Sequence, residues 1–386
     1  MNRYHGHPDI TWFRAVGTMI GGVVGVGVFG LPFAFAQSGW GLGLLILLAL
    51  GGLLLVLNLM YAEINIQTPG KHRLVGLVKK YLGSGWSHFA TAIFIPYSWG
   101  AMLAYMLVGG DFLYALLSPL FGGPIIIYQV AIALLAAALT FGGVKKLAKM
   151  EFGVILALLF LFVFIILVSL PSLAWQNVLP LHFSNWFVPY GVIFFAMSGL
   201  GVIPEMKEVL GNRHKKDLPH TVLVGQVLIF ILYALFTLAV VGVTGAATTE
   251  AAFDGLATKF GPIFAVAGSL LGAITVVSIF SIVSIEMQDI WRFDYKLSQK
   301  KSWALAAFVP IIILFFGFNK FVDLIGFLGA VFGGVIGILV VVMYQKMRRD
   351  CPNLAHCSMK VPQVVVWLLI AVFAGGIIQT VLGLGH

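Results

Sequence analysis

Charged residues are scarce in this sequence, and their scarcity excludes an ordinary soluble protein. Asp, Glu, Lys and Arg make up 10% of the 386 residues, whereas hydrophobic residues make up 60%. Soluble domains carry about 25% charged residues, because polar groups must cover a surface that faces water. The formal charge of +9 does not indicate nucleic acid binding, since the basic residues form short clusters between long apolar runs. The composition therefore predicts a protein whose solvent is the lipid bilayer.

Cysteine is almost absent, and few other reactive groups are arranged for chemistry. The two cysteines, Cys351 and Cys357, flank His356 in one short polar stretch, and a zinc site needs more ligands at closer spacing. The sequence has no HExxH motif, nucleophile elbow or phosphate-binding loop. We expect free thiols, no metal site, no cofactor and no enzymatic activity.

Eleven apolar runs are long enough to cross a membrane as helices, which takes roughly 20 residues each. With the N-terminus inside, all of the 23 Lys and Arg except Lys259 and Lys320 fall on the inner side, as orientation by positive charge requires. We expect one multi-pass domain over 1–386 in the cell (cytoplasmic) membrane, with a cytoplasmic N-terminus and an outer C-terminus. The runs are 13–36, 40–66, 86–117, 124–143, 151–171, 186–210, 221–243, 261–285, 302–318, 320–345 and 361–383.

Two of these runs carry signals of broken helices. Run 13–36 holds five glycines between Gly21 and Gly30, followed by Pro32, and run 186–210 holds Gly199, Gly201 and Pro204. Glycine weakens a helix by about 1 kcal/mol relative to alanine, and an interior proline by about 3. Small residues also allow close helix packing, which is the alternative explanation. A proline in both runs favours unwound backbone, which inside a membrane must be buried or line a cavity.

The two broken runs lie five runs apart, which predicts an internal repeat. Ranges 13–171 and 186–345 would each hold five helices, and 361–383 would add an eleventh. Because five is odd, the second repeat enters the membrane from the opposite side. Paired interrupted helices of this kind mark the binding site of inverted-repeat transporters such as the leucine transporter. We therefore expect an all-α, leucine-transporter-like fold with a transport site between the two breaks. The loops 71–83 and 245–261 are expected to form short amphipathic helices, the second as a lid.

Unwound peptide groups at such breaks suit a zwitterion. Free amides at a half-helix N-terminus bind an anion, and free carbonyls bind a cation. An α-amino acid presents both charges, so we expect amides of span one to hold its carboxylate and carbonyls of span six to hold its ammonium. The side-chain pocket is expected to be apolar and modest, suited to small or hydrophobic neutral amino acids. The residues expected at this substrate site are Gly25, Val26, Gly27, Phe29, Tyr105, Phe195, Ala196, Ser198, Gly199 and Ser278.

The run GVGVFGLPFAFAQSG, residues 25–39, resembles the first-span signature of the amino acid/auxin permease family within the amino acid–polyamine–cation superfamily. The run IFFAMSGLGVIPEMKEVLG, residues 193–211, is similar to the sixth span of its proton-coupled amino acid transporter branch. The resemblance implies secondary active transport of amino acids by alternating access. Ser198 stands where that branch often has glutamate, which is the main departure.

The coupling ion is expected to be a proton or sodium. Ionisable groups at membrane depth are functional candidates, which points first to Glu205 and then to Glu63 and Asp111 as proton sites. In the resembled fold a sodium ion would lie between span one and hydroxyls of span eight. This alternative would use Gly22, Thr275, Ser278 and Ser281. Because span eight lacks an adjacent hydroxyl pair and span one lacks a polar side chain at Gly22, protons are favoured.

Two other classes fit many spans and remain as alternatives. A channel rarely needs inverted repeats with two broken helices, and saturable counterflow would distinguish it from a carrier. An amino acid sensor on a transporter fold would bind its ligand without accumulating it. The expected partners are a small-molecule amino acid and the lipid bilayer, with no nucleic acid, and the protein is expected to act as a monomer.

Overall fold

The computed structural model describes residues 10–141, 147–350 and 360–383, and in these segments the chain is helical with no β-strand. Each of the eleven predicted runs coincides with one helix, with a pair of helices separated by a break, or, in the tenth run, with two helices joined by a π-helical stretch. Cys351, His356 and Cys357, for which no metal site is expected, lie outside the described residues.

The helices follow the apolar runs closely in both halves of the chain. The first half contains α1 (Ile10–Val23), α2 (Gly27–Ser38), α3 (Trp40–Gln67), α4 (Leu74–Leu82), α5 (Ser84–Phe121), α6 (Ile125–Phe141) and α7 (Leu147–Ser169). The second contains α8 (Trp175–Val178), α9 (Val188–Met197), α10 (Ile203–His214), α11 (Leu218–Thr244), α12 (Phe253–Phe260), α13 (Pro262–Asp289), α14 (Gln299–Leu314), α15 (Phe321–Phe327), α16 (Gly334–Asp350) and α17 (Gln363–Gly383).

Several of these helices have the length and composition of membrane spans. In the described part of the chain, six helices are long and apolar enough to cross a bilayer, and seven if the bent pair α1 and α2 counts as one. At 1.5 Å per residue, the 28-residue α3 is roughly 42 Å long, more than the hydrocarbon core of about 30 Å. Helices α4 and α12 occupy the two loops where short amphipathic helices were predicted. The multi-pass architecture is confirmed, while the orientation of the termini stays a prediction.

The two halves pack as an inverted repeat. Helix α1 packs against α10, and α2 packs against α9, so each half of the first broken span meets the opposite half of the sixth. A pseudo-twofold axis in the membrane plane requires this arrangement, in which the N-terminal half of one broken span lies beside the C-terminal half of the other. The expected fold, with five helices in each repeat and an eleventh helix at the end, is confirmed.

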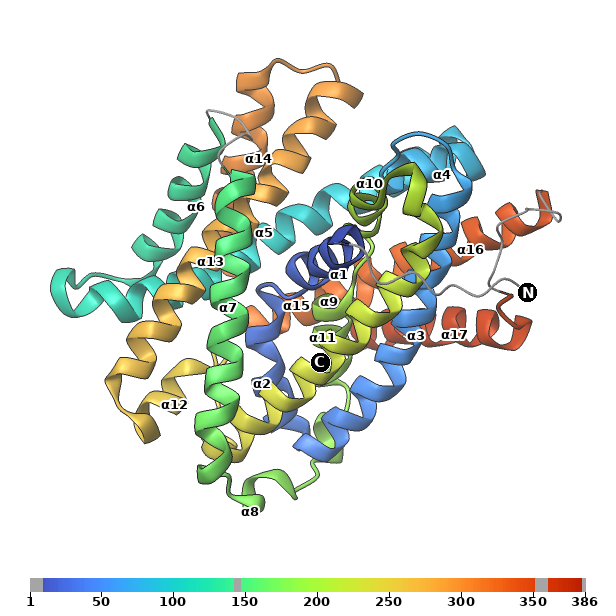
Figure 1. Cartoon of the computed structure of the whole chain (residues 1–386). Helices are drawn as coiled ribbons and strands as arrows, with labels where there is room; N and C mark the ends of the chain where they lie inside the picture. The colour runs from blue at the N-terminus through green and yellow to red at the C-terminus, as the bar shows by residue number, and fades with distance from the viewer. Residues whose placement is uncertain (1–9, 142–146, 351–359, 384–386) are drawn as a thin grey trace.

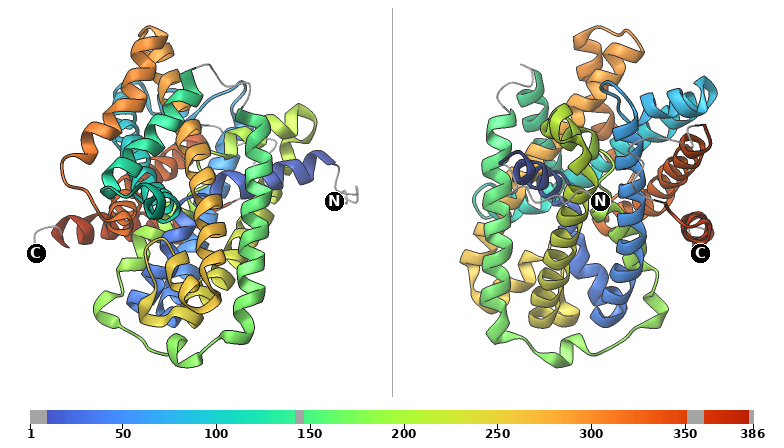
Figure 2. Two further views of the ribbon diagram at one scale, coloured as in Figure 1. Left: turned by 90° about the vertical axis from the view of Figure 1, so that its left-hand side faces the viewer. Right: turned by 45° about the vertical axis from the view of Figure 1, so that its right-hand side comes forward.

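Two groups of helices divide the molecule. The broken helices pack with α3 and α11, whereas α5, α6, α13 and α14 pack with one another. Helix α7 contacts both α11 and α13, and Figures 1 and 2 show it running along the side of the molecule from the α10 end toward the α8 and α12 end. Because the first group contains both breaks, the site predicted from the sequence would lie between the two groups.

The backbone of helix α9 lies in direct contact with the backbone of the tenth span, at the end of α15 and in the π-helical stretch Leu328–Gly333 that joins α15 to α16. A Cβ added to Gly191 would overlap the carbonyl of Gly326, and one added to Gly329 would overlap the carbonyl of Gly191. Backbone groups cannot move aside as side-chain tips can. These glycines therefore set the position of α9 relative to the tenth span.

We expect Gly191→Ala to lower the thermal unfolding midpoint of the purified protein, because overpacking costs about 1–3 kcal/mol. Gly375→Ala on α17 is the matched control, since nothing lies within 4 Å of its added Cβ. An unchanged midpoint in the Gly191 variant would contradict the close packing described here.

Candidate functional site

The first span is broken where its glycines predict. Helix α1 ends at Val23 and α2 begins at Gly27, with a bend of 59° between them. The amide of Val24 donates to the carbonyl of Ile20 at 2.8 Å, and the next backbone bond runs from Val28 to Gly25 at 3.3 Å. In the described part of the chain, no backbone hydrogen bond is found for the amides of Gly25 and Val26. Two amides are thus left free for another acceptor.

The sixth span is broken in the corresponding place. Helix α9 ends at Met197 and α10 begins at Ile203, and Ser198 between them is extended, with φ −69° and ψ 112°. The two breaks are in direct contact: a Cβ added to Gly27 would lie 2.8 Å from Cα of Ala196. The prediction of paired discontinuous helices that meet each other is confirmed.

Polar side chains of neighbouring helices hold the broken ends. The hydroxyl of Tyr233 on α11 lies 3.2 Å from the carbonyl oxygen of Val23 and 3.1 Å from that of Ala196, and it is the donor to both. Gln226 donates to the carbonyl of Met197 at 3.2 Å and accepts from the Asn58 amide at 3.0 Å. Unpaired buried carbonyls are costly, so these contacts stabilise the unwound backbone.

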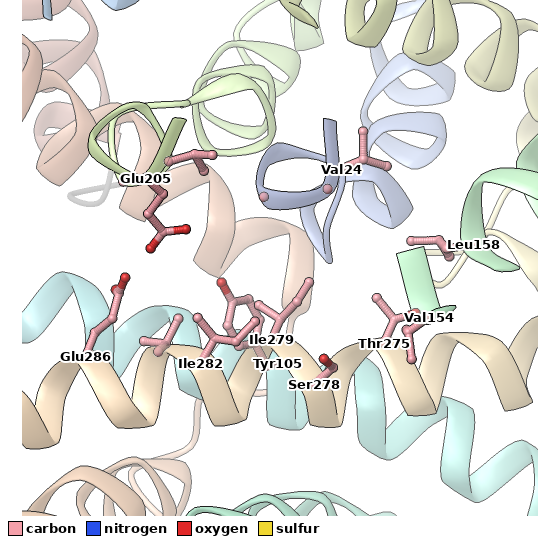
Figure 3. Close-up of a pocket in the computed structure, with 15 residues that line it drawn as sticks. Val24, Tyr105, Val154, Leu158, Glu205, Thr275, Ser278, Ile279, Ile282 and Glu286 are labelled. Carbon is pink, nitrogen blue, oxygen red and sulfur yellow. The ribbon is translucent and has the colours of Figure 1, made fainter. Parts of the chain in front are cut away.

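A cavity of about 170 Å³ lies next to the breaks, between α1 and α10 on one side and α13 on the other. Figure 3 shows one face of α13 as the wall opposite α1 and α10, along the lower part of the view. Tyr105 projects from α5 into the same space. The lining on α13 repeats every three or four residues, which is one helix face. The lining residues are Gly21, Gly22, Val24, Tyr105, Val154, Leu158, Gly201, Val202, Glu205, Thr275, Ser278, Ile279, Ile282, Val283 and Glu286.

One end of this cavity carries two carboxylates. Glu205 at the start of α10 and Glu286 near the end of α13 point toward each other across the space (Figure 3). The Glu205 side chain is 44% exposed, and its Oε1 lies 3.5 Å from the guanidinium of Arg73, just before α4. The cavity therefore reaches solvent at the Glu205 end, on the predicted inner side.

Beyond the Thr275 end of the cavity, four aromatic rings pack together and form a seal. The ring of Phe29 lies 5.0 Å from that of Phe112, 5.5 Å from that of Phe253 and 6.0 Å from that of Phe162. All four side chains are buried, and Phe253 is the first residue of α12. The loop predicted as a lid thus supplies one ring of this seal. The conformation is closed on the predicted outer side and open on the inner side.

The structure brings some of the predicted residues together and separates others. Tyr105 and Ser278 of the expected substrate site line the cavity, as do Gly22, Thr275, Ser278 and Glu205 of the expected coupling groups. Gly25 is covered by Ile279, whose Cδ1 would lie 2.7 Å from an added Cβ. The residues that stand at the breaks or in the seal without lining the cavity are Gly25, Val26, Gly27, Phe29, Phe195, Ala196, Ser198 and Gly199.

Three expected coupling residues lie away from the cavity. Glu63 is buried near the end of α3, where it accepts from the Gln67 amide at 3.4 Å. Asp111 lies in the outer part of α5, and Ser281 donates to the carbonyl of Val277 at 2.7 Å. Among the described residues, no three His, Cys, Asp or Glu side chains gather as a metal site would require.

Sequence reasoning missed Glu286 and the polar residues that hold the breaks. The predicted eighth run ends at 285, whereas α13 continues to Asp289, so Glu286 falls just outside the predicted span. Its spacing of four from Ile282 and eight from Ser278 is the signal that could have found it. Asn58 and Gln226 were recognisable as amide side chains within the apolar runs of spans two and seven.

Comparison with known proteins supports one family. The chain is similar to the tyrosine-specific transport system 1 of Haemophilus influenzae, with 24% identity covering 87% of this chain and 88% of the relative. It is also similar to an aromatic amino acid permease of Lactococcus lactis subsp. cremoris, with 28% identity over 48% of this chain and 42% of that protein.

Solved structures share the fold. MhsT in complex with L-phenylalanine superposes with a TM-score of 0.71 at 14% identity over 99% of both chains. The manganese transporter of Eremococcus coleocola gives a TM-score of 0.72 at 13% identity, over 100% of this chain and 90% of its own. The family model described as transmembrane amino acid transporter protein matches residues 8–382. The chain therefore belongs to this family of membrane transporters, the amino acid/auxin permeases, and is not an enzyme.

Proposed function

We propose that this protein is a proton-coupled secondary transporter of neutral amino acids, with aromatic amino acids as preferred substrates. The observation that carries the proposal is the free backbone at two facing breaks beside a cavity that opens to one side only. Such backbone inside a membrane protein is tolerated where it is buried or lines a cavity. The names of the relatives, a tyrosine-specific system and an aromatic amino acid permease, support the substrate class.

The binding mode follows from the broken helices. The substrate carboxylate is held by the amides of Gly25, Val26 and Gly27, and its ammonium by carbonyls around Phe195 and Ser198. In the present conformation Ile279 fills the space in front of Gly25. Ile279 must therefore withdraw when substrate binds, and the substrate side chain then extends along the apolar face of α13 toward Tyr105.

Alternating access follows from the unequal ends of the cavity. The aromatic seal closes the predicted outer side while the Glu205 end is open, as expected of a carrier captured in an inward-facing state. A channel would be open at both ends at once. One chain contains both repeats and the whole cavity, so a single chain suffices for the transport cycle proposed here.

Sodium coupling is the second candidate, because Gly22 faces Thr275 and Ser278 across the same cavity. The hydroxyl of Thr275 donates to the carbonyl of Leu271 at 2.7 Å, which leaves its oxygen lone pairs available to a cation. Carboxylates at the open end of the cavity favour protons instead.

Transport by the purified protein in liposomes tests the proposal. We expect uptake of L-tyrosine and L-phenylalanine against their gradients when the lumen is alkaline, and saturable exchange when labelled and unlabelled substrate are on opposite sides. Accumulation driven only by an inward sodium gradient would identify sodium, instead of the proton, as the coupling ion. Binding of amino acids without exchange would identify a sensor, and non-saturable flux would identify a channel.

A further inference from the structure

A second carboxylate, Glu286, lies inside the cavity and has no role in the binding mode above. It stands on the cavity face of α13, four residues beyond Ile282 and eight beyond Ser278. At 1.5 Å per residue, it is roughly 12 Å along the helix from Ser278, toward the predicted inner side. In Figure 3 its carboxylate is directed at that of Glu205 rather than at the helix it belongs to.

The two carboxylates differ in how their charge is balanced. Glu205 is half-exposed and paired with Arg73 at 3.5 Å. Glu286 is partly buried, and within the described residues no hydrogen bond or salt bridge is found for its carboxylate. Glu205 therefore has a cation of its own, and Glu286 has none within bonding distance.

Among the residues that the structure describes, no second cation faces Glu286. Glu205 on α10, Arg73 before α4 and Asp289 on α13 are the charged groups that act on it, and Tyr105 of α5 lines the same cavity. Among the described side chains, α7 contributes only Val154 and Leu158 to the lining, and α6, α12 and α14 contribute none. A carboxylate at membrane depth without a partner cation is a natural place for a proton to bind and leave.

We propose that Glu286 carries the proton that is coupled to amino acid transport, which rests on the proposed function above. When the cavity faces outward, a proton from that solution adds to a carboxylate oxygen of Glu286 and gives the neutral acid. The neutral acid enters the closed state with the substrate and without an unpaired charge. When the cavity opens at the Glu205 end, the proton passes to water on the inner side and the carboxylate is restored.

The test uses the full-length protein in liposomes of phosphatidylethanolamine and phosphatidylglycerol, with L-tyrosine as substrate and a pH-sensitive dye inside. We expect Glu286→Gln to reduce accumulation driven by an alkaline lumen by about tenfold or more, and to abolish substrate-induced acidification of the lumen. Exchange of tyrosine at equal concentrations should persist within about threefold of the unmodified protein and should lose its pH dependence. Glu286→Asp should restore part of the acidification.

Asp323→Asn is the control, because the Asp323 carboxylate near the start of α15 is 70% exposed and lies outside the cavity lining. It should behave like the unmodified protein in every measurement. Accumulation with normal acidification in Glu286→Gln would overturn the proposal, and so would loss of tyrosine exchange together with acidification, since this would make Glu286 a structural or binding residue. Absence of amino acid exchange in the unmodified protein would instead reject the proposed function itself. Accumulation driven by a sodium gradient alone would reject its proton coupling.

Discussion

Replacing Ser278 by phenylalanine should reduce amino acid uptake by about 100-fold or more while the protein stays folded. Ser278 lies in the middle of the cavity face of α13, between Thr275 and Ile282. An added phenyl ring would occupy part of the cavity of about 170 Å³ that the side chain of an aromatic substrate would need. Because the added ring extends into empty space rather than into packed side chains, the fold should tolerate it.

The control for this variant is Ile274→Phe on the same helix. The Ile274 side chain is 40% exposed and lies outside the cavity lining, so the larger ring should leave uptake within about twofold of the unmodified protein. Uptake by initial rate and thermal stability with and without tyrosine should be measured for both variants. Normal uptake by Ser278→Phe would show that substrate does not pass along this face of α13.

The sequence was sufficient to predict the breaks because helix propensity is a local property. Five glycines ahead of Pro32, and Gly199 and Gly201 ahead of Pro204, weaken the helix wherever the chain folds. The structure places the ends of α1 and α9 within these runs. The repeat followed from counting, since two similar interruptions five spans apart leave one simple arrangement.

The position of substrate-facing residues could not be predicted in the same way, because it depends on contacts between distant segments and on the conformational state. Gly25 is a free amide in the sequence-based view, yet Ile279 from a helix some 250 residues away covers it. Phe29 was expected in the pocket and instead forms the seal with Phe112 and Phe253. Predicting Glu286 as a cavity residue would have required both the true end of α13 and the position of α10 opposite it. These are tertiary facts.

Removing the hydroxyl of Tyr233 should have an effect out of proportion to its size. Tyr233→Phe keeps the ring, which is completely buried, and deletes the donor shared by the carbonyls of Val23 and Ala196. Buried acceptors left without a donor cost about 1–3 kcal/mol. These carbonyls terminate the half-helices on both sides of the site, so the cost applies to the arrangement that binds substrate.

At about 1.4 kcal/mol per factor of ten, tyrosine affinity should fall by about tenfold or more in Tyr233→Phe, with a modest loss of thermal stability. Tyr114→Phe is the control, since Tyr114 is 39% exposed near the outer end of α5 and should change neither quantity. Binding can be followed by the tyrosine-dependent rise in the thermal midpoint and by the concentration dependence of exchange. If Tyr233→Phe lost stability but kept its affinity, the two breaks would be held for folding alone, and the substrate would have to bind elsewhere in the cavity. A loss of affinity larger than the loss of stability would mean that the hydroxyl acts on the peptide groups that receive the amino acid.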